Sequence, residues 1–343
     1  MRDGEPSDRE RAIDDARRAI VAGGVAGAHR DGDARGAGAH GDRDAPGGTD
    51  QGDGARMLSP SRYLAWLYSP EAQQPVLAKL CEIESEISSS LRPGIDHHVA
   101  HARLQWWQEE CERCAQGRPV HPMTRELVKA YGSAAVARQP SPLAGISGFV
   151  DAAVWDLAGA TFETRKELNA YCARWSAAMF ETAAGYVTSS TPGAVAASSG
   201  AEPAISRWRV LGAAVREIEL LTGLAREAHA GRVRVPLDEL DRAGVEVGSL
   251  AKPPWPGALV TLLRERYEAL RTTIAESVST LGREEQAGFR GLLVWTALAW
   301  GQSARAQRAL PGIIFPRRYH ALADGWQAWR AARRAAAGKL RLS

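Results

Sequence analysis

The chain has 343 residues, of which 45% are hydrophobic and 24% are charged, and its formal net charge at pH 7 is +3. A charge balance this close to neutral argues against nucleic acid as a partner. The longest largely apolar run, residues 291–300, is about half of what a membrane-spanning helix needs, so we expect a protein that is soluble or attached to a membrane surface. The four cysteines include one close pair, Cys111-x-x-Cys114, and no second pair that would complete a zinc site, which favours a cytoplasmic protein with reduced thiols.

Residues 1–56 are predicted to form a disordered leader. They are rich in glycine, they alternate aspartate, arginine and histidine, and they show apolar periodicity only between Ala12 and Val25. The mixture of acids and arginines argues against an organelle transit peptide, and the leader lacks the apolar stretch of a secretion signal. Residues 57–343 are expected to form one folded domain that starts at Met57.

Helical periodicity dominates the predicted domain. Apolar residues recur three and four positions apart in residues 208–224 and again in residues 262–281, which is typical of helices with one buried face. No stretch alternates apolar and polar residues convincingly, as a half-buried strand would. The pattern therefore predicts an all-α fold.

Four blocks of the chain carry a pattern more specific than helical periodicity. They are the acidic stretch 81–89; Arg103-Leu104-Gln105-Trp106-Trp107 with Gly117-Arg118-Pro119 and His121-Pro122; Phe149-Val150-Asp151 with Asp156-Leu157 and Tyr171-Cys172; and residues 211–245, which close on Gly231-Arg232, Pro236 and Leu237-Asp238-Glu239-Leu240-x-x-Ala243-Gly244-Val245. In residue types and spacing, these blocks resemble the squalene/phytoene synthase family over about residues 60–335. The resemblance implies an isoprenoid-synthase-like helical bundle around a central cavity.

The family's two aspartate motifs are largely missing from this sequence. The resemblance implies a head-to-head condensation of prenyl diphosphates, in which these aspartates hold magnesium ions against the diphosphate. The outer aspartates of the first motif fall on Ser85 and Ser89, and those of the second fall on Gly223 and Glu227. Because magnesium prefers carboxylate and other hard oxygen ligands, a serine holds it poorly and a glycine side chain not at all.

Three glutamates remain as residual metal ligands, Glu86 in the first motif and Glu219 and Glu227 in the second. If they converge on one cavity, the cofactor is Mg²⁺; otherwise we expect no cofactor. The alternative is that they are ordinary helix glutamates held by arginines, and Arg216, three residues before Glu219, is an expected partner.

The resemblance also points to Arg103, Asp156 and Arg232 as substrate-binding residues. Each of the three lies within one of the matching blocks. A role in packing alone is the alternative for each of them.

Two functions follow from the resemblance. The one we favour is a catalytically inactive member of the family, similar to the mitochondrial complex I assembly factors, which binds a partner protein or a prenyl lipid in the old cavity. The other is an active prenyltransferase that condenses two prenyl diphosphates with a divergent metal site. A third reading combines the two, with the chain binding prenyl chains beside a catalytic paralogue.

The segment after Gln302 is strongly basic. Its basic residues face a single acid, Asp324, with Trp326 and Trp329 among them; they are Arg305, Arg308, Arg317, Arg318, Arg330, Arg333, Arg334, Lys339 and Arg341. A basic amphipathic helix with tryptophans is typical of attachment to an anionic membrane surface. A terminal helix that packs its tryptophans on the body fits the sequence equally well. We therefore expect a cytoplasmic protein and leave open its attachment to the inner membrane face.

Overall fold

The structure is a computed structural model that describes residues 59–92, 94–137, 140–190, 201–313 and 320–342. Every regular element within these ranges is helical, so the prediction of an all-α fold is confirmed. The predicted leader, residues 1–56, lies outside the described residues, and the domain boundary at Met57 stays a prediction.

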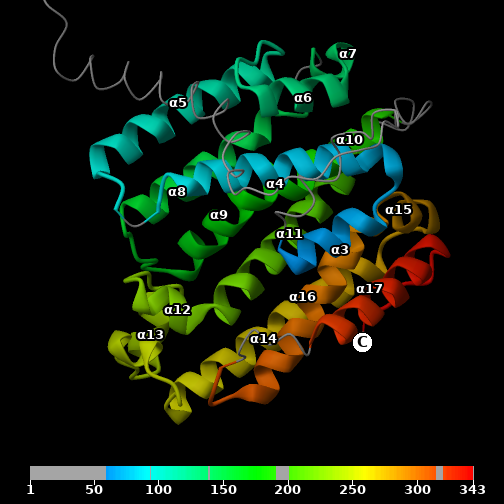
Figure 1. The fold of residues 1–343 in the computed structure, drawn as a ribbon. Coiled ribbons are helices and arrows are strands. Elements are labelled where there is room, and N and C mark those ends of the chain that lie inside the picture. Colours follow the sequence, from blue (N-terminus) through cyan, green and yellow to red (C-terminus); the bar gives the residue numbers. More distant parts are fainter. Residues whose placement is uncertain (1–58, 93, 138–139, 191–200, 314–319, 343) are drawn as a thin grey trace, which may run out of the picture.

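The helices lie in two groups with one long helix, α11, between them (Figure 1). In that view α4, α5, α6, α8 and α9 lie above α11, and α3, α14, α16 and α17 lie below it. The elements in chain order are α3 (Pro60–Tyr68), η1 (Glu71–Gln73), α4 (Gln74–Ser89), α5 (His97–Ala115), α6 (Pro122–Tyr131), α7 (Ser133–Val136), η2 (Ala144–Ser147), α8 (Gly148–Leu157), α9 (Arg165–Ser176), η3 (Ala177–Glu181), α10 (Thr182–Ser190), α11 (Ala201–Thr222), α12 (Leu224–His229), α13 (Leu237–Arg242), η5 (Val247–Ala251), α14 (Gly257–Ser279), α15 (Arg283–Gly288), α16 (Arg290–Ala309) and α17 (His320–Ala336).

Helix α11 is the centre of the packing. It contacts α9 on one side and α14 and α16 on the other. Its predicted apolar face is buried, with Leu211, Val215 and Ile218 fully covered. On α14 the predicted pattern holds from Tyr267 onward, whereas Leu263 rather than Leu262 is the leucine that enters the core. The apolar periodicity therefore predicted the buried faces of α11 and α14, and it was wrong by one position at the start of α14.

Helix α16 is enclosed by its neighbours. Every residue from Gly291 to Ala299 is buried, because α3, α11, α14 and α17 all pack against this helix. The approach of α3 requires a glycine, since a Cβ at Gly291 would lie 1.8 Å from Ser69 Oγ and 2.8 Å from the carbonyl oxygen of Ala65. The longest apolar run of the chain is thus a core helix of a helical protein.

The connection between α5 and α6 is held by a buried carboxylate. Glu110 is fully buried and accepts hydrogen bonds from the backbone N–H groups of Val120 (2.8 Å) and His121 (2.9 Å) and from the hydroxyl of Thr124. The guanidinium of Arg113 also lies 2.9 Å from it. This network holds the segment before α6 and the first turn of α6 against α5.

We expect Glu110→Ala to lower the free energy of unfolding by about 3 kcal/mol, because it leaves buried N–H groups and the Arg113 cation without their acceptor. The control is Glu112→Ala, which removes an exposed glutamate two residues further along α5 and should cost less than about 0.5 kcal/mol. Urea unfolding of both variants measures the difference. Equal effects would show that the Glu110 network does not stabilise the α5–α6 connection.

Candidate functional site

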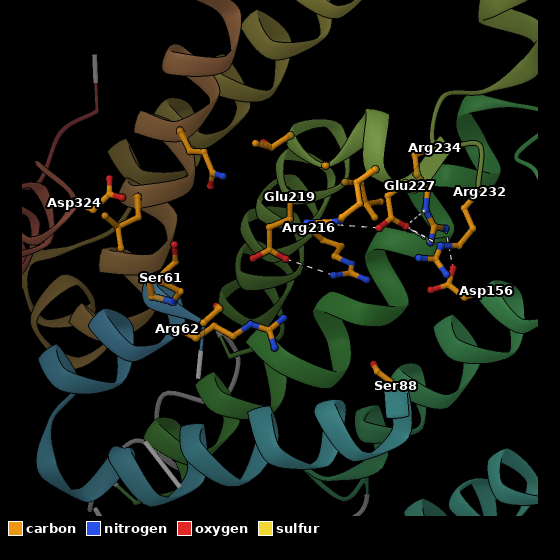
Figure 2. A pocket seen from close by; sticks show the side chains of 18 of the residues that line it. Ser61, Arg62, Ser88, Asp156, Arg216, Glu219, Glu227, Arg232, Arg234 and Asp324 are labelled. Atoms are coloured by element: carbon orange, nitrogen blue, oxygen red, sulfur yellow. Dashed lines mark hydrogen bonds and ion pairs between the residues drawn. The ribbon is translucent and has the colours of Figure 1, made fainter. Parts of the chain in front are cut away.

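A cavity of about 1160 Å³ opens where α4, α8, α11 and α12 meet α3, α16 and the start of α17. Seven arginines and four carboxylates line it, together with apolar side chains such as Leu91, Leu220 and Leu298. We call it the arginine-lined cavity (Figure 2). Its charged lining residues are Arg62, Arg92, Arg216, Arg226, Arg232, Arg234, Arg305, Asp156, Glu219, Glu227 and Asp324.

Glu227 lies at the centre of a cluster at one end of the cavity (Figure 2). Gly231, with φ +78°, ends α12 and turns the chain so that the backbone N–H of Arg232 reaches the carbonyl oxygen of Glu227 at 2.9 Å. The guanidinium of Arg232 then lies 2.9 Å from the Glu227 carboxylate, and the guanidinium of Arg234 lies 3.1 Å from the same carboxylate. Arg234 also donates to Asp156 on α8 at 2.7 Å. Two predicted substrate residues, Asp156 and Arg232, and one predicted metal ligand, Glu227, therefore meet in one ion-pair cluster.

The cluster keeps the Glu227 carboxylate ionised. Burial by itself would raise the pKa of Glu227, but the hydrogen bonds and positive charges of Arg232 and Arg234 outweigh it and lower the pKa below its ordinary value. Arg234 is only 2% exposed, so its charge depends on Asp156 and Glu227 for compensation. The carboxylate of Glu227 is therefore already paired with two arginines.

Glu219 is held in a second ion pair in the middle of the cavity. Arg216 lies 3.5 Å from it, as the spacing predicted, and the indole N–H of Trp295 donates to it at 3.2 Å. The Arg216 guanidinium also lies 5.2 Å from the ring centroid of Trp175 and donates to the Tyr171 hydroxyl at 3.2 Å. The Nε atom of Arg216 is buried without a hydrogen-bond partner. This cation is therefore packed against the aromatic core and still has one N–H to donate.

Glu86 and Arg103 lie outside the lining of the cavity. They form an ion pair with each other at 3.3 Å, and Arg103 donates to the Ser89 hydroxyl at 3.0 Å. These contacts join α5 to α4. The structure thus assigns Arg103 a packing contact and places Glu86 apart from Glu219 and Glu227.

The residues of α4 that serve the cavity differ from those of the motif comparison. Ser88 lines the cavity, whereas Ser85 and Ser89 do not. One turn before Ser88, Glu84 is 7% exposed and pairs with Arg62, which does line the cavity, and Trp175 donates to it at 2.7 Å.

The sequence analysis did not single out Glu84. The signal was present, because Glu84 falls on the same helical face as Leu77, Leu80 and Cys81, and a carboxylate on a buried face predicts an internal ion pair. Arg62 on α3 had no comparable signal, since its partner is distant in the sequence.

Gly223 separates α11 from α12 and is the N-cap of the short helix. A Cβ at this position would lie 2.8 Å from an Nη atom of Arg226, whose side chain is 80% exposed. The position that the motif comparison gave to a metal-binding aspartate is thus occupied by a helix break with an arginine folded over it.

Three aromatic side chains of the core pack behind the charged residues that line the cavity. Trp175 and Trp295, which donate to Glu84 and Glu219, pack with their ring centroids 5.8 Å apart, and Phe180 lies 5.3 Å from Trp295. All three are at most 1% exposed. This aromatic floor fills the space between the cavity and the core.

These side chains do not fit a magnesium cluster. Glu86, Glu219 and Glu227 each have an arginine within 3.5 Å, and a divalent ion beside them would be repelled by those guanidinium groups. In the described part of the chain, no group of three or more His, Cys, Asp and Glu side chains is arranged to hold a metal ion. The arrangement is instead suited to an anion with several oxygen atoms, because guanidinium groups donate to such oxygens in pairs.

Comparison with known proteins places the fold. The squalene/phytoene synthase family model matches residues 55–324. A dehydrosqualene synthase crystallised with a ligand is similar in structure, with a TM-score of 0.62 and 16% sequence identity over 83% of this chain and 96% of that chain. Squalene synthase HpnC from Alicyclobacillus acidocaldarius has a TM-score of 0.61 and 13% identity over 77% and 94% of the two chains. No curated protein matches in sequence. The prediction of an isoprenoid synthase fold is confirmed.

We expect Glu227→Gln to lower the free energy of unfolding at pH 7 by about 1–3 kcal/mol, because it removes a charge that two arginines share. The folded-state pKa of Glu227 is lowered, so its contribution is present above about pH 4.5 and is lost as the pH falls through the folded-state value. Urea unfolding at pH 7 and pH 3.5 should show the gap to the unaltered protein shrinking in acid. Glu246→Gln, at an exposed glutamate, is the control. A gap that stays constant with pH would contradict the assigned ion pairs.

Proposed function

The chain belongs to the squalene/phytoene synthase family, and from this premise we propose that it binds a prenyl diphosphate, or a prenyl lipid with a similar anionic head group, without ionising it. The observation that carries the proposal is the pairing of Glu219 and Glu227 with arginines inside the cavity. The family binds prenyl diphosphates, so the ligand class follows from membership, whereas binding without reaction is inferred from this chain's own side chains.

The head group would bind at the arginine side of the cavity. Seven guanidinium groups against four carboxylates leave the lining with an excess of positive charge. Arg226 and Arg92 are exposed, and Arg226 has only a 3.7 Å contact with Glu227. Such side chains are free to turn toward phosphate oxygens, and the leucines of the lining offer apolar surface for the start of a prenyl chain.

Ionisation of the ligand would require a stronger counter-charge than this lining supplies. Breaking an allylic carbon–oxygen bond places new negative charge on the leaving diphosphate, which must be stabilised as it forms. Arg216, Arg232 and Arg234 each already share their charge with a carboxylate. The remaining charge is sufficient for binding but small beside that of a cluster of divalent ions.

An active prenyltransferase is the second candidate. Two observations favour it: the family membership, and the presence of Glu219 and Glu227 in the lining of one cavity. In that case magnesium would have to displace the arginines from both carboxylates.

We expect farnesyl diphosphate to bind equally well with magnesium and with a chelator, and farnesol to bind at least tenfold more weakly, because the arginines recognise the head group. Arg226→Ala should weaken farnesyl diphosphate binding about tenfold, the value of one hydrogen bond to a charged group. Arg125→Ala, at an exposed arginine of α6 far from the lining, is the matched control. Titration calorimetry measures both.

Diphosphate release is followed in the same samples. We expect none above the rate of spontaneous hydrolysis. Release that requires magnesium and disappears with the chelator and in Glu227→Ala would overturn the proposal and establish an active enzyme with a rebuilt metal site.

A further inference from the structure

Helix α17 is anchored to the body by one face. Ala328, Ala331, Ala332 and Ala335 are at most 7% exposed, and the helix contacts α3, α15 and α16. The Gln327 amide also donates to the carbonyl oxygen of Ala297 at 2.5 Å. Small apolar side chains, this hydrogen bond and the ion pair between Asp324 and Arg305 therefore hold α17 on the body.

The opposite face carries those large residues into solvent. Leu322, Trp326 and Trp329 are 88%, 60% and 36% exposed, and their spacing of four and three residues places them in one stripe. The two indole rings stack with centroids 4.7 Å apart. The alanines, and not Trp326, therefore make the contact with the body that the sequence analysis left open between the two arrangements.

Basic side chains follow the apolar stripe along the chain. Arg330, Arg333, Arg334, Lys339 and Arg341 are all exposed, and the Arg333 guanidinium lies 4.9 Å from the ring centroid of Trp329. No acidic residue follows Asp324, and Asp324 itself is paired with Arg305 at 2.7 Å. Leu322, Trp326, Trp329 and these five basic residues form what we call the α17 surface.

The α17 surface begins at the rim of the arginine-lined cavity. Ala321 and Asp324, at the start of the helix, line that cavity, and Ala321 is exposed. Helix α3, which contacts α17, exposes two further large side chains, Tyr63 and Leu67. None of the helices in the described ranges is long and apolar enough to cross a bilayer.

We propose that the α17 surface docks the protein on an anionic phospholipid membrane. Indole rings are favoured at the level of lipid head groups, and basic side chains beside them are attracted to the phosphates. The charge pattern selects this occupant: a second copy of the chain would bring the same cations face to face, whereas an anionic bilayer neutralises them. Docking of this kind holds the cavity rim next to the lipid phase, where an amphiphile with an anionic head group resides.

The test is sedimentation of the full chain with vesicles that contain no prenyl lipid, either of phosphatidylcholine alone or with 30% phosphatidylglycerol. We expect binding only to the anionic vesicles. Each basic residue near the lipid contributes about a fivefold change in partitioning, so Arg330→Gln/Arg333→Gln/Arg334→Gln should lower it about a hundredfold. Trp326→Ala/Trp329→Ala should lower it at least tenfold while the variant still unfolds cooperatively in urea, because alanines hold α17 on the body.

The matched control is Arg118→Gln/Arg125→Gln/Arg242→Gln, which removes the same charge from exposed arginines on other elements. An equal loss in this control would overturn the proposal, because the binding would then depend on net charge alone. Absence of sedimentation with anionic vesicles would also overturn the proposal. If the protein forms a dimer and Trp326→Ala/Trp329→Ala dissociates it, the surface would be assigned to a second copy of the chain instead. Arg226→Ala should sediment like the unaltered protein, so failure of docking and failure of ligand binding are distinguishable.

Discussion

The two ion pairs of Arg234 are the interaction on which the cavity depends. Its guanidinium is almost completely buried and joins Asp156 on α8 to Glu227 on α12. An unpaired charge in that position would cost several kcal/mol, so both carboxylates are needed to keep the helices together. The consequence reaches beyond stability, because oxygens that hold a buried arginine are withdrawn from any metal ion.

Two further carboxylates at the cavity are also paired with arginines. Arg216 pairs with Glu219 and Arg62 pairs with Glu84. Trp295 donates a hydrogen bond to Glu219, and Trp175 donates one to Glu84. In this cavity the arginines outnumber the carboxylates, seven to four. Glu219 and Glu227 serve as counter-ions of guanidinium groups, and the excess of positive charge attracts anions.

The sequence predicted the framework better than the site, for a physical reason. Helical periodicity records burial, and it located the core of α11 and most of that of α14. The positions of α4 that reach the cavity are a matter of register. A shift of one residue on a helix moves a side chain by about 100°, and Ser88 rather than Ser89 lines the cavity. Contacts between distant segments determine the positions of Arg62, Arg234 and the aromatic floor. No local sequence pattern predicts such contacts.

The glycine break between α11 and α12 has a consequence for the lining of the cavity. An aspartate side chain at Gly223 would lie close to the Arg226 guanidinium, but Arg226 is 80% exposed and can turn away from it. The lining at this end therefore combines a movable cation, Arg226, with the fixed cation of Arg234, whose partners Asp156 and Glu227 hold it in place.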